Sequence, residues 1–233
     1  MILKYLLAFI LFCSMELFSD NKIKANLYSN GFTHVKFMLQ SPMLSEHEAK
    51  WRKEKQEYIK NIIIKADKKT VFSMLLSPYI SKNPFFRFTY KTITANKLTL
   101  KYTDNYNVSK KITTKFKEKN RPYTLDTSKY KLITPQISMS DMIVPIHIIS
   151  NIPLKSVKIS TISNDTSTHR FVAKFFIQPR SIVDYRFKIK MDNTSTVQVI
   201  FEKEDGSLHT IENFVEYGCA VIDGWVFTNK FNF

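Results

Sequence analysis

Apolar side chains recur at every second position through most of this sequence, and this period constrains the fold more than any other feature. Because successive side chains of a β-strand point to opposite faces, the period indicates strands with one buried face. Hydrophobic residues make up 44% and aromatic residues 14% of the chain, enough to fill a core between sheets. The alternating positions include Val35, Phe37, Leu39, Phe86, Phe88, Tyr90, Leu98, Leu100, Tyr102, Val144, Ile146, Ile148, Phe171, Ala173, Phe175, Val183, Tyr185, Phe187, Val197, Val199 and Phe201. We expect an all-β protein in which each half of the chain forms one small antiparallel sandwich.

Glycine is scarce, and its scarcity excludes several classes of enzyme. The spacing of the 4 glycines matches no dinucleotide-binding loop, phosphate-binding loop or nucleophile elbow. One of them, Gly206, follows Asp205 between two apolar segments, which predicts a tight hairpin turn.

Two segments depart from the alternating pattern. The segment 45–58 begins with Ser45, has Glu48 three residues later, and carries acids before bases, which predicts a short exposed helix between strands. The segment 117–135 is rich in Lys, Asn, Thr, Ser and Pro and shows no sustained alternation. It is therefore predicted to be the linker between the halves.

The start of the chain resembles a secretory signal peptide. Lys4 precedes an apolar run that ends in a short polar exit, and we expect cleavage near Ser19. The apolar run is too short for a stable membrane span, so residues 1–19 are predicted to direct export and to be removed.

Export makes the cysteines informative. Once residues 1–19 are removed, Cys219 is the only cysteine left, in a compartment where thiols are normally paired. Such a residue is either a small buried hydrophobe or a thiol kept free for chemistry. Position alone leaves both alternatives open.

Charge is concentrated in the first half of the chain. Residues 20–134 hold 24 Lys and Arg against 9 Asp and Glu, a net +15, whereas residues 135–233 hold 10 of each and are neutral. This excess either steers acidic partners or serves solubility. No nucleic-acid partner is expected, because no recognition motif accompanies the charge.

Neither the histidines nor the carboxylates form a catalytic or metal-binding pattern. The 5 histidines have no paired spacing, so no metal site is expected. Glu202 and Glu204 flank a turn, where carboxylates are normally solvated, and so no catalytic residue is assigned.

Several motifs are more specific than generic strand sequence. The turn Ser81-Lys82-Asn83-Pro84 leads into an aromatic strand, and Leu98 to Asp104 ends in an aromatic-x-Asp. This pattern resembles the SoxZ family, one part of the carrier of the Sox thiosulfate-oxidation system. Ser41-Pro42-Met43 stands where that family usually has His-Pro-Met. Segments from Lys158 to Ser207, followed by Gly218-Cys219, more loosely resemble SoxY. The order implies a SoxZ-like domain fused ahead of a divergent SoxY-like domain.

The resemblance implies a fold, a role and a site. Both families are immunoglobulin-like sandwiches, and SoxY carries sulfur intermediates on a thiol at a flexible arm. The implied carrier residue is Cys219, with Gly218 and Ala220 as the arm, and the implied adduct is a covalent sulfur group with no other cofactor. The implied partners are a periplasmic c-type cytochrome and sulfur-oxidising enzymes. The resemblance implies that the carrier itself is not an enzyme. The implied division is a domain 20–116, a linker 117–135, a domain 136–220 and a tail 221–233.

The arm departs from the family pattern, which leaves a second function open. The family has glycines on both sides of the cysteine, whereas Tyr217 and Ala220 stiffen the backbone here. Thirteen residues follow Ala220, and their apolar side chains favour a folded tail. The alternative function is therefore a non-covalent binding or adaptor module of an exported redox system that has lost the carrier arm.

Overall fold

The computed structural model describes residues 21–138, 143–179 and 181–218 and contains sixteen strands and one short helix within them. The strands of the first half are β1 (Lys22–Tyr28), β2 (Phe32–Met38), β3 (Ile59–Ala66), β4 (Lys69–Leu76), β5 (Phe85–Lys91), β6 (Leu98–Asp104), β7 (Ser109–Thr114) and β8 (Phe116–Lys119). The strands of the second half are β9 (Lys131–Ile133), β10 (Ile137–Ser138), β11 (Ile143–Ser150), β12 (Leu154–Ser163), β13 (His169–Phe176), β14 (Ser181–Lys190), β15 (Ser195–Lys203) and β16 (Leu208–Tyr217). The helix is α2 (Glu46–Arg52).

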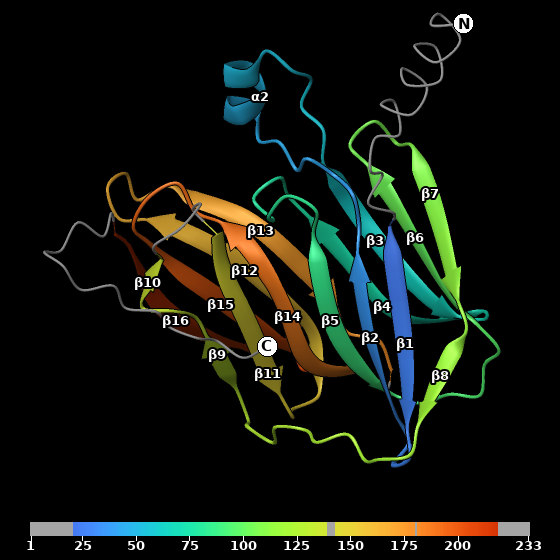
Figure 1. Cartoon of the computed structure of the whole chain (residues 1–233). Helices are drawn as coiled ribbons and strands as arrows, with labels where there is room; N and C mark the ends of the chain where they lie inside the picture. The colour runs from blue at the N-terminus through green and yellow to red at the C-terminus, as the bar shows by residue number, and fades with distance from the viewer. Residues whose placement is uncertain (1–20, 139–142, 180, 219–233) are drawn as a thin grey trace, which may run out of the picture.

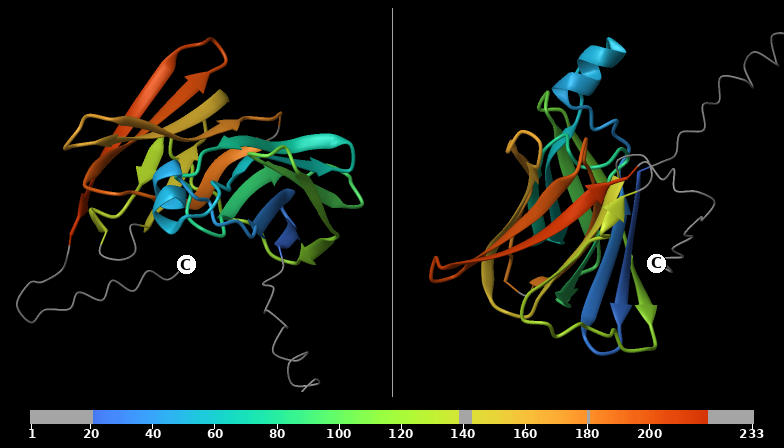
Figure 2. Two further views of the ribbon diagram at one scale, coloured as in Figure 1. Left: turned by 90° about the horizontal axis from the view of Figure 1, so that it is seen from above. Right: turned by 90° about the vertical axis from the view of Figure 1, so that its left-hand side faces the viewer.

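The strands form two sheets that face each other, and each sheet contains strands of both halves (Figures 1 and 2). The seven-stranded sheet has the order β8-β1-β2-β5-β14-β11-β9, and the nine-stranded sheet has the order β10-β16-β15-β12-β13-β4-β3-β6-β7. The all-β class, the two immunoglobulin-like sandwich halves and the helical insertion are thereby confirmed. The halves meet edge to edge, because β5 pairs with β14 in one sheet and β4 pairs with β13 in the other.

Aromatic side chains fill the core where the halves meet. Phe72 and Phe88 of the first half stack at 4.2 Å between ring centroids, and Phe175 and Tyr185 of the second half stack at 4.7 Å. Phe72 also meets Tyr185 edge-on at 5.6 Å, which joins the two pairs. These four rings are buried within one hydrophobic cluster that extends through both halves. Such offset and edge-on pairs add to the stabilisation from area burial.

The predicted helix exists and is pinned to the second half. Ser45 accepts a hydrogen bond from Glu48 N, and the Glu48 carboxylate accepts one from Ser45 N, so the capping box is present. The helix projects from one end of the sandwich (Figure 1), with Trp51 78% exposed. The Glu48 carboxylate also receives the ammonium of Lys190, which donates to the carbonyl of Met43 as well. One β14 side chain thus holds the helix base.

Two of the three motifs that carry the SoxZ resemblance, Ser41 to Met43 and Ser81 to Pro84, lie side by side at this seam. Ser41 N donates to the side-chain oxygen of Asn83, and Asn83 N donates to Ser41 O at 2.9 Å. Asn83 has a φ of 49°, a left-handed conformation that Asn tolerates better than most residues. Ser81 N in turn donates to Lys188 O of β14 at 3.1 Å. The turn therefore joins the halves as well as opening β5.

The segment between the halves, predicted as a linker, is tied down along its length. Its first residues belong to β8, which pairs in parallel with β1, and later residues form β9 at the edge of the seven-stranded sheet. Tyr123 donates its backbone N–H to Asn30 and accepts from the Asn30 amide, at 3.0 and 2.9 Å. The boundaries 20–116 and 136–220 remain a prediction.

Candidate functional site

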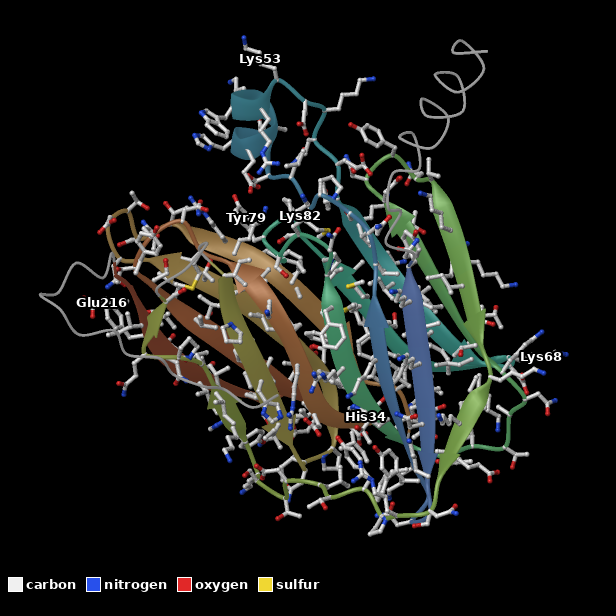
Figure 3. The ribbon with its side chains drawn as sticks, in the orientation of Figure 1. His34, Lys53, Lys68, Tyr79, Lys82 and Glu216 are labelled. Carbon is white, nitrogen blue, oxygen red and sulfur yellow. The ribbon has the colours of Figure 1, made fainter. Side chains whose placement is uncertain are left out.

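The chain approaches the predicted carrier cysteine along the outermost strands of the nine-stranded sheet. Gly218, the last described residue before Cys219, donates its N–H to Ser138 O at 3.3 Å, and Glu216 N donates to Gln136 O at 2.9 Å. These bonds form the short parallel pair of β16 with β10. Figure 3 labels Glu216 at the end of the sandwich opposite to Lys68. Cys219, Ala220 and the tail 221–233 lie outside the described residues.

Gly218 lies close to the side chain of Ile137. A Cβ atom at Gly218 would lie 3.2 Å from Cγ2 of Ile137, tighter than ordinary van der Waals contact. Tyr217, which the sequence marks as a stiff residue of the arm, donates its N–H to the Thr194 hydroxyl at 3.0 Å. The residues before Cys219 are therefore fixed to the sheet, and glycine suits the last of them.

A pocket lies near this edge of the molecule, on the outer face of the seven-stranded sheet. Its volume is about 390 Å³, and apolar residues and cations line it together. Its lining residues include Phe85, Arg87, Ile133, Pro135, Pro145, His147, Arg186, Phe187 and Lys188. Pro135 is separated from Ser138, the backbone partner of Gly218, by three residue steps, which in an extended chain span at most roughly 10 Å. The pocket wall and the attachment point of Cys219 are therefore close neighbours.

A polar network built around Asp184 borders this pocket. Its carboxylate accepts hydrogen bonds from the Tyr123 hydroxyl at 2.9 Å and from Nε2 of His147 at 2.7 Å, and Nε of Arg186 lies 3.6 Å away. Burial by itself raises the pKa of Asp184, but the hydrogen bond and charge of His147, the Tyr123 hydroxyl and the charge of Arg186 hold this pKa below its usual value. Asp184 is therefore a charged, satisfied group that joins the linker to two strands.

An irregular register in β14 sets this network in place. Ile182 pairs with Thr89 and Arg186 pairs with Arg87, which leaves three residues of β14 opposite the single residue Phe88. Such a bulge re-aims side chains and often lies next to functional sites. No local sequence pattern predicts it, because its cause is the pairing of β14 with a strand far away in the chain.

Tyr123 and His34 complete the network on its other side. Their rings stack with centroids 5.2 Å apart, and Nδ1 of His34 lies 3.1 Å from the Thr89 hydroxyl. Burial and the nearby charge of Asp184 raise the pKa of Tyr123 to about 12. Burial, followed by the charge of Lys36, lowers the pKa of His34 to about 4. Both groups are therefore neutral at pH 7.

The structure brings only some of the histidines together. His34 and His147 lie in the Asp184 network, whereas His209 stacks on Tyr130 at 4.1 Å and His47 is exposed on α2. Within the described residues, no three His, Cys, Asp or Glu side chains are grouped so that they could hold a metal ion. The same residues contain no helix long and apolar enough to cross a membrane.

Fold and pocket together define a class: a pair of immunoglobulin-like sandwiches joined edge to edge, with a cationic pocket beside the end of the second. Two family models then match almost the whole described chain. The model described as sulphur oxidation protein SoxZ matches residues 23–115, and that described as sulfur oxidation protein SoxY matches residues 115–219. The chain belongs to the sulfur-oxidation carriers, as a SoxZ domain followed by a SoxY domain in one polypeptide.

The solved structures that match the chain are distant from it. The sulfur carrier protein SoxY from Chlorobium limicola f thiosulfatophilum is 22% identical over 40% of this chain and 81% of its own, with a TM-score of 0.33. Murine CEACAM1b is 9% identical, covering 85% of this chain and all of its own, with a TM-score of 0.26. The chicken interferon gamma receptor alpha chain is 10% identical, covering 84% and 97%, also at 0.26. No curated protein matches the chain at a significant level.

Proposed function

We propose that this chain carries a sulfur group covalently on Cys219 and presents it to redox and hydrolytic enzymes in the periplasm. The observation that supports this most is the extent of the SoxY match, which runs to residue 219. The match thus ends on the one cysteine that remains once the expected signal peptide is removed. Gly218 and Ala220 are the proposed arm, and Gly218 is held at an edge of the sandwich by Ser138.

Loading such a carrier with thiosulfate is an oxidation. The Cys219 thiol loses its proton, a sulfur–sulfur bond forms to the terminal sulfur of thiosulfate, and two electrons leave. A c-type cytochrome is the partner that accepts these electrons, one at a time. Sulfur-oxidising enzymes then act on the bound group. The carrier itself holds and presents the group and catalyses no step.

Tetrathionate tests this proposal without an enzyme. A thiolate displaces thiosulfate from tetrathionate and keeps the other half, which yields the same adduct with no external oxidant. We expect the intact mass of the folded chain to rise by one such group and to return to its starting value with a reductant. The test uses the processed chain, from which cleavage near Ser19 removes the only other cysteine, Cys13. In that chain Cys219→Ser should abolish the gain.

The rival function predicts the opposite result. An adaptor that has lost the arm would gain no mass while folded, because its cysteine would be packed as a small hydrophobe. Mass gain that persists in Cys219→Ser would also contradict the proposal.

A further inference from the structure

Four Lys or Arg side chains and one histidine form an unbroken row across the outer face of the seven-stranded sheet. Lys24 of β1 pairs with Lys36 of β2, Lys36 with Arg87 of β5, Arg87 with Arg186 of β14, and Arg186 with His147 of β11. These five residues, the cationic ladder, occupy five adjacent strands and span roughly 19 Å at the usual spacing between strands. The ladder crosses the seam, so neither half contains it alone.

Like charges lie next to each other in the ladder, and few carboxylates lie near enough to neutralise them. Residues directly opposite one another on neighbouring strands are close, and like charges there are destabilising. Burial, followed by the charges of Arg87 and Arg186, lowers the pKa of Lys36, and burial followed by Arg186 lowers that of Arg87. Within the described part of the chain, Asp184 is the one carboxylate that forms an ion pair with the ladder. Its own hydrogen bonds to His147 and Tyr123 already occupy it.

The centre of the ladder borders two hollows. Arg87 and Arg186 line the pocket of about 390 Å³ and also a second one of about 340 Å³, which His34 and Lys36 line from the other side. His34, labelled in Figure 3, lies two residues before Lys36 on β2. The guanidinium of Arg87 packs over the Phe85 ring, with Cζ 5.1 Å from the ring centroid. Paired guanidinium groups beside a concave surface suit an oxyanion.

We propose that Arg87 and Arg186 form a binding site for a sulfur oxyanion of the thiosulfate type. The sulfonate end meets the guanidinium groups, and the softer terminal sulfur lies against Phe85 and Pro145 in the adjoining pocket. This geometry favours thiosulfate over sulfate, because sulfate has no weakly hydrated end for the apolar wall. The site rests on the ladder and on the pocket, and it stands whether or not Cys219 carries a group.

Titration of the full chain with free thiosulfate at constant ionic strength tests the site. We expect saturable binding by calorimetry, with Arg87→Gln weakening it about tenfold or more, as the loss of a charge-assisted hydrogen bond predicts. Arg87 is the first choice because it has no ion pair with a described carboxylate, so its replacement relieves repulsion and should not unfold the chain. Lys36→Gln should weaken binding less, since Lys36 lines only the second pocket.

A matched control has the same charges without the pockets. Lys101 of β6 and Lys111 of β7 are also directly opposite each other, both exposed, on the other sheet. Lys101→Gln with Lys111→Gln removes two charges and should leave thiosulfate binding unchanged. Equal weakening by this control, or binding of sulfate as tight as that of thiosulfate, would overturn the proposal. If an acidic polypeptide binds the chain and thiosulfate shows no saturable binding, the ladder belongs to a protein partner. This result would also overturn the proposal.

The site could take either the group bound to Cys219 or the free ion. Loading the chain with tetrathionate before the titration distinguishes the two. If the group bound to Cys219 fills the site, the loaded chain should bind free thiosulfate at least tenfold more weakly, and Cys219→Ser should bind it normally after the same treatment. If the loaded chain binds as before, the site takes the free ion. Binding in Cys219→Ser keeps this test independent of the proposed carrier role.

Discussion

At the scale of single residues, Asp184 shows how one buried carboxylate organises the seam. It is 6% exposed and receives Tyr123 from the linker and His147 from β11, beside Arg186 of its own strand. A buried acceptor with three such neighbours stabilises the fold only while all are present, because each neighbour left unpaired costs its desolvation.

Asp184→Asn should lower the free energy of unfolding by about 2 kcal/mol, since it removes the charge that satisfies His147 and Arg186. Chemical denaturation measures this. The control is Asp192→Asn, which breaks an ion pair with Arg170 in which Asp192 is 54% exposed and which should cost less than about 1 kcal/mol. Equal losses of unfolding free energy in both variants would show that the Asp184 network stabilises the fold no more than an exposed ion pair does.

His34 should make the fold sensitive to mild acid. Its pKa is about 4 in the folded chain and 6.5 in the unfolded chain, so between these values the unfolded state binds a proton that the folded state does not. Stability is therefore present above pH 6.5 and is lost as the pH falls toward 4, by about 2 kcal/mol between pH 7.5 and 5. The groups that face His34 are Tyr123, Lys36, Asp184, Arg87 and Arg186.

Denaturation curves at the two pH values check this expectation. His34→Gln should flatten the dependence, whereas His47→Gln, on the exposed helix, should keep it. An unchanged slope in His34→Gln would contradict the assignment.

At the scale of elements, the sequence predicts what local chemistry determines. Alternation predicts β5, β11, β14 and β15, the capping box predicts α2, and Asp205-Gly206 predicts the β15–β16 turn, where Gly206 has a φ of 82°. The short strands β8, β9 and β10 have no such signal, because pairing with distant strands alone makes them extended.

The same reasoning explains which parts of the candidate site could not be predicted from the sequence. Cys219 stands out as a lone cysteine and Gly218 as its neighbour, whereas the cationic ladder becomes visible only with the register of five strands. Tyr123 lies in a polar segment with no period, and its role depends on a bulge in β14.

Deletion of residues 221–233 tests the element after the cysteine. Its apolar side chains should bury against the sandwich, each contributing roughly 1.5 to 3 kcal/mol, and should tether Cys219 at both ends. The deletion should therefore lower thermal stability and speed the reaction of Cys219 with a bulky thiol reagent, whereas Asn229→Ser should change neither. Unchanged rate and stability after deletion would contradict the tether.

At the scale of the whole molecule, the fused halves share both sheets and one core. The pairs β5–β14 and β4–β13 make each sheet continuous, and Phe72, Phe175 and Tyr185 bridge the halves inside. Fusion makes this pairing intramolecular, so its strength does not depend on protein concentration.

Calorimetry should therefore record a single unfolding transition. Phe175→Ala, at a fully buried seam position, should lower the free energy of unfolding by about 3 to 5 kcal/mol. The chain should still unfold in one transition. Phe171→Ala, in the same strand but 38% exposed, should cost much less. Two transitions, of which only one responds to Phe175→Ala, would show that the halves unfold separately.

The central claim is that Cys219 accepts a sulfur group while the chain is folded. The most direct measurement is the rate at which tetrathionate adds its group to the folded chain, followed by intact mass, relative to the rate in the urea-unfolded chain. We predict rates within about tenfold of each other, since a thiol on a surface arm reacts without prior unfolding. Modification of the unfolded chain alone, with the folded chain unchanged over the same time, would contradict the carrier function.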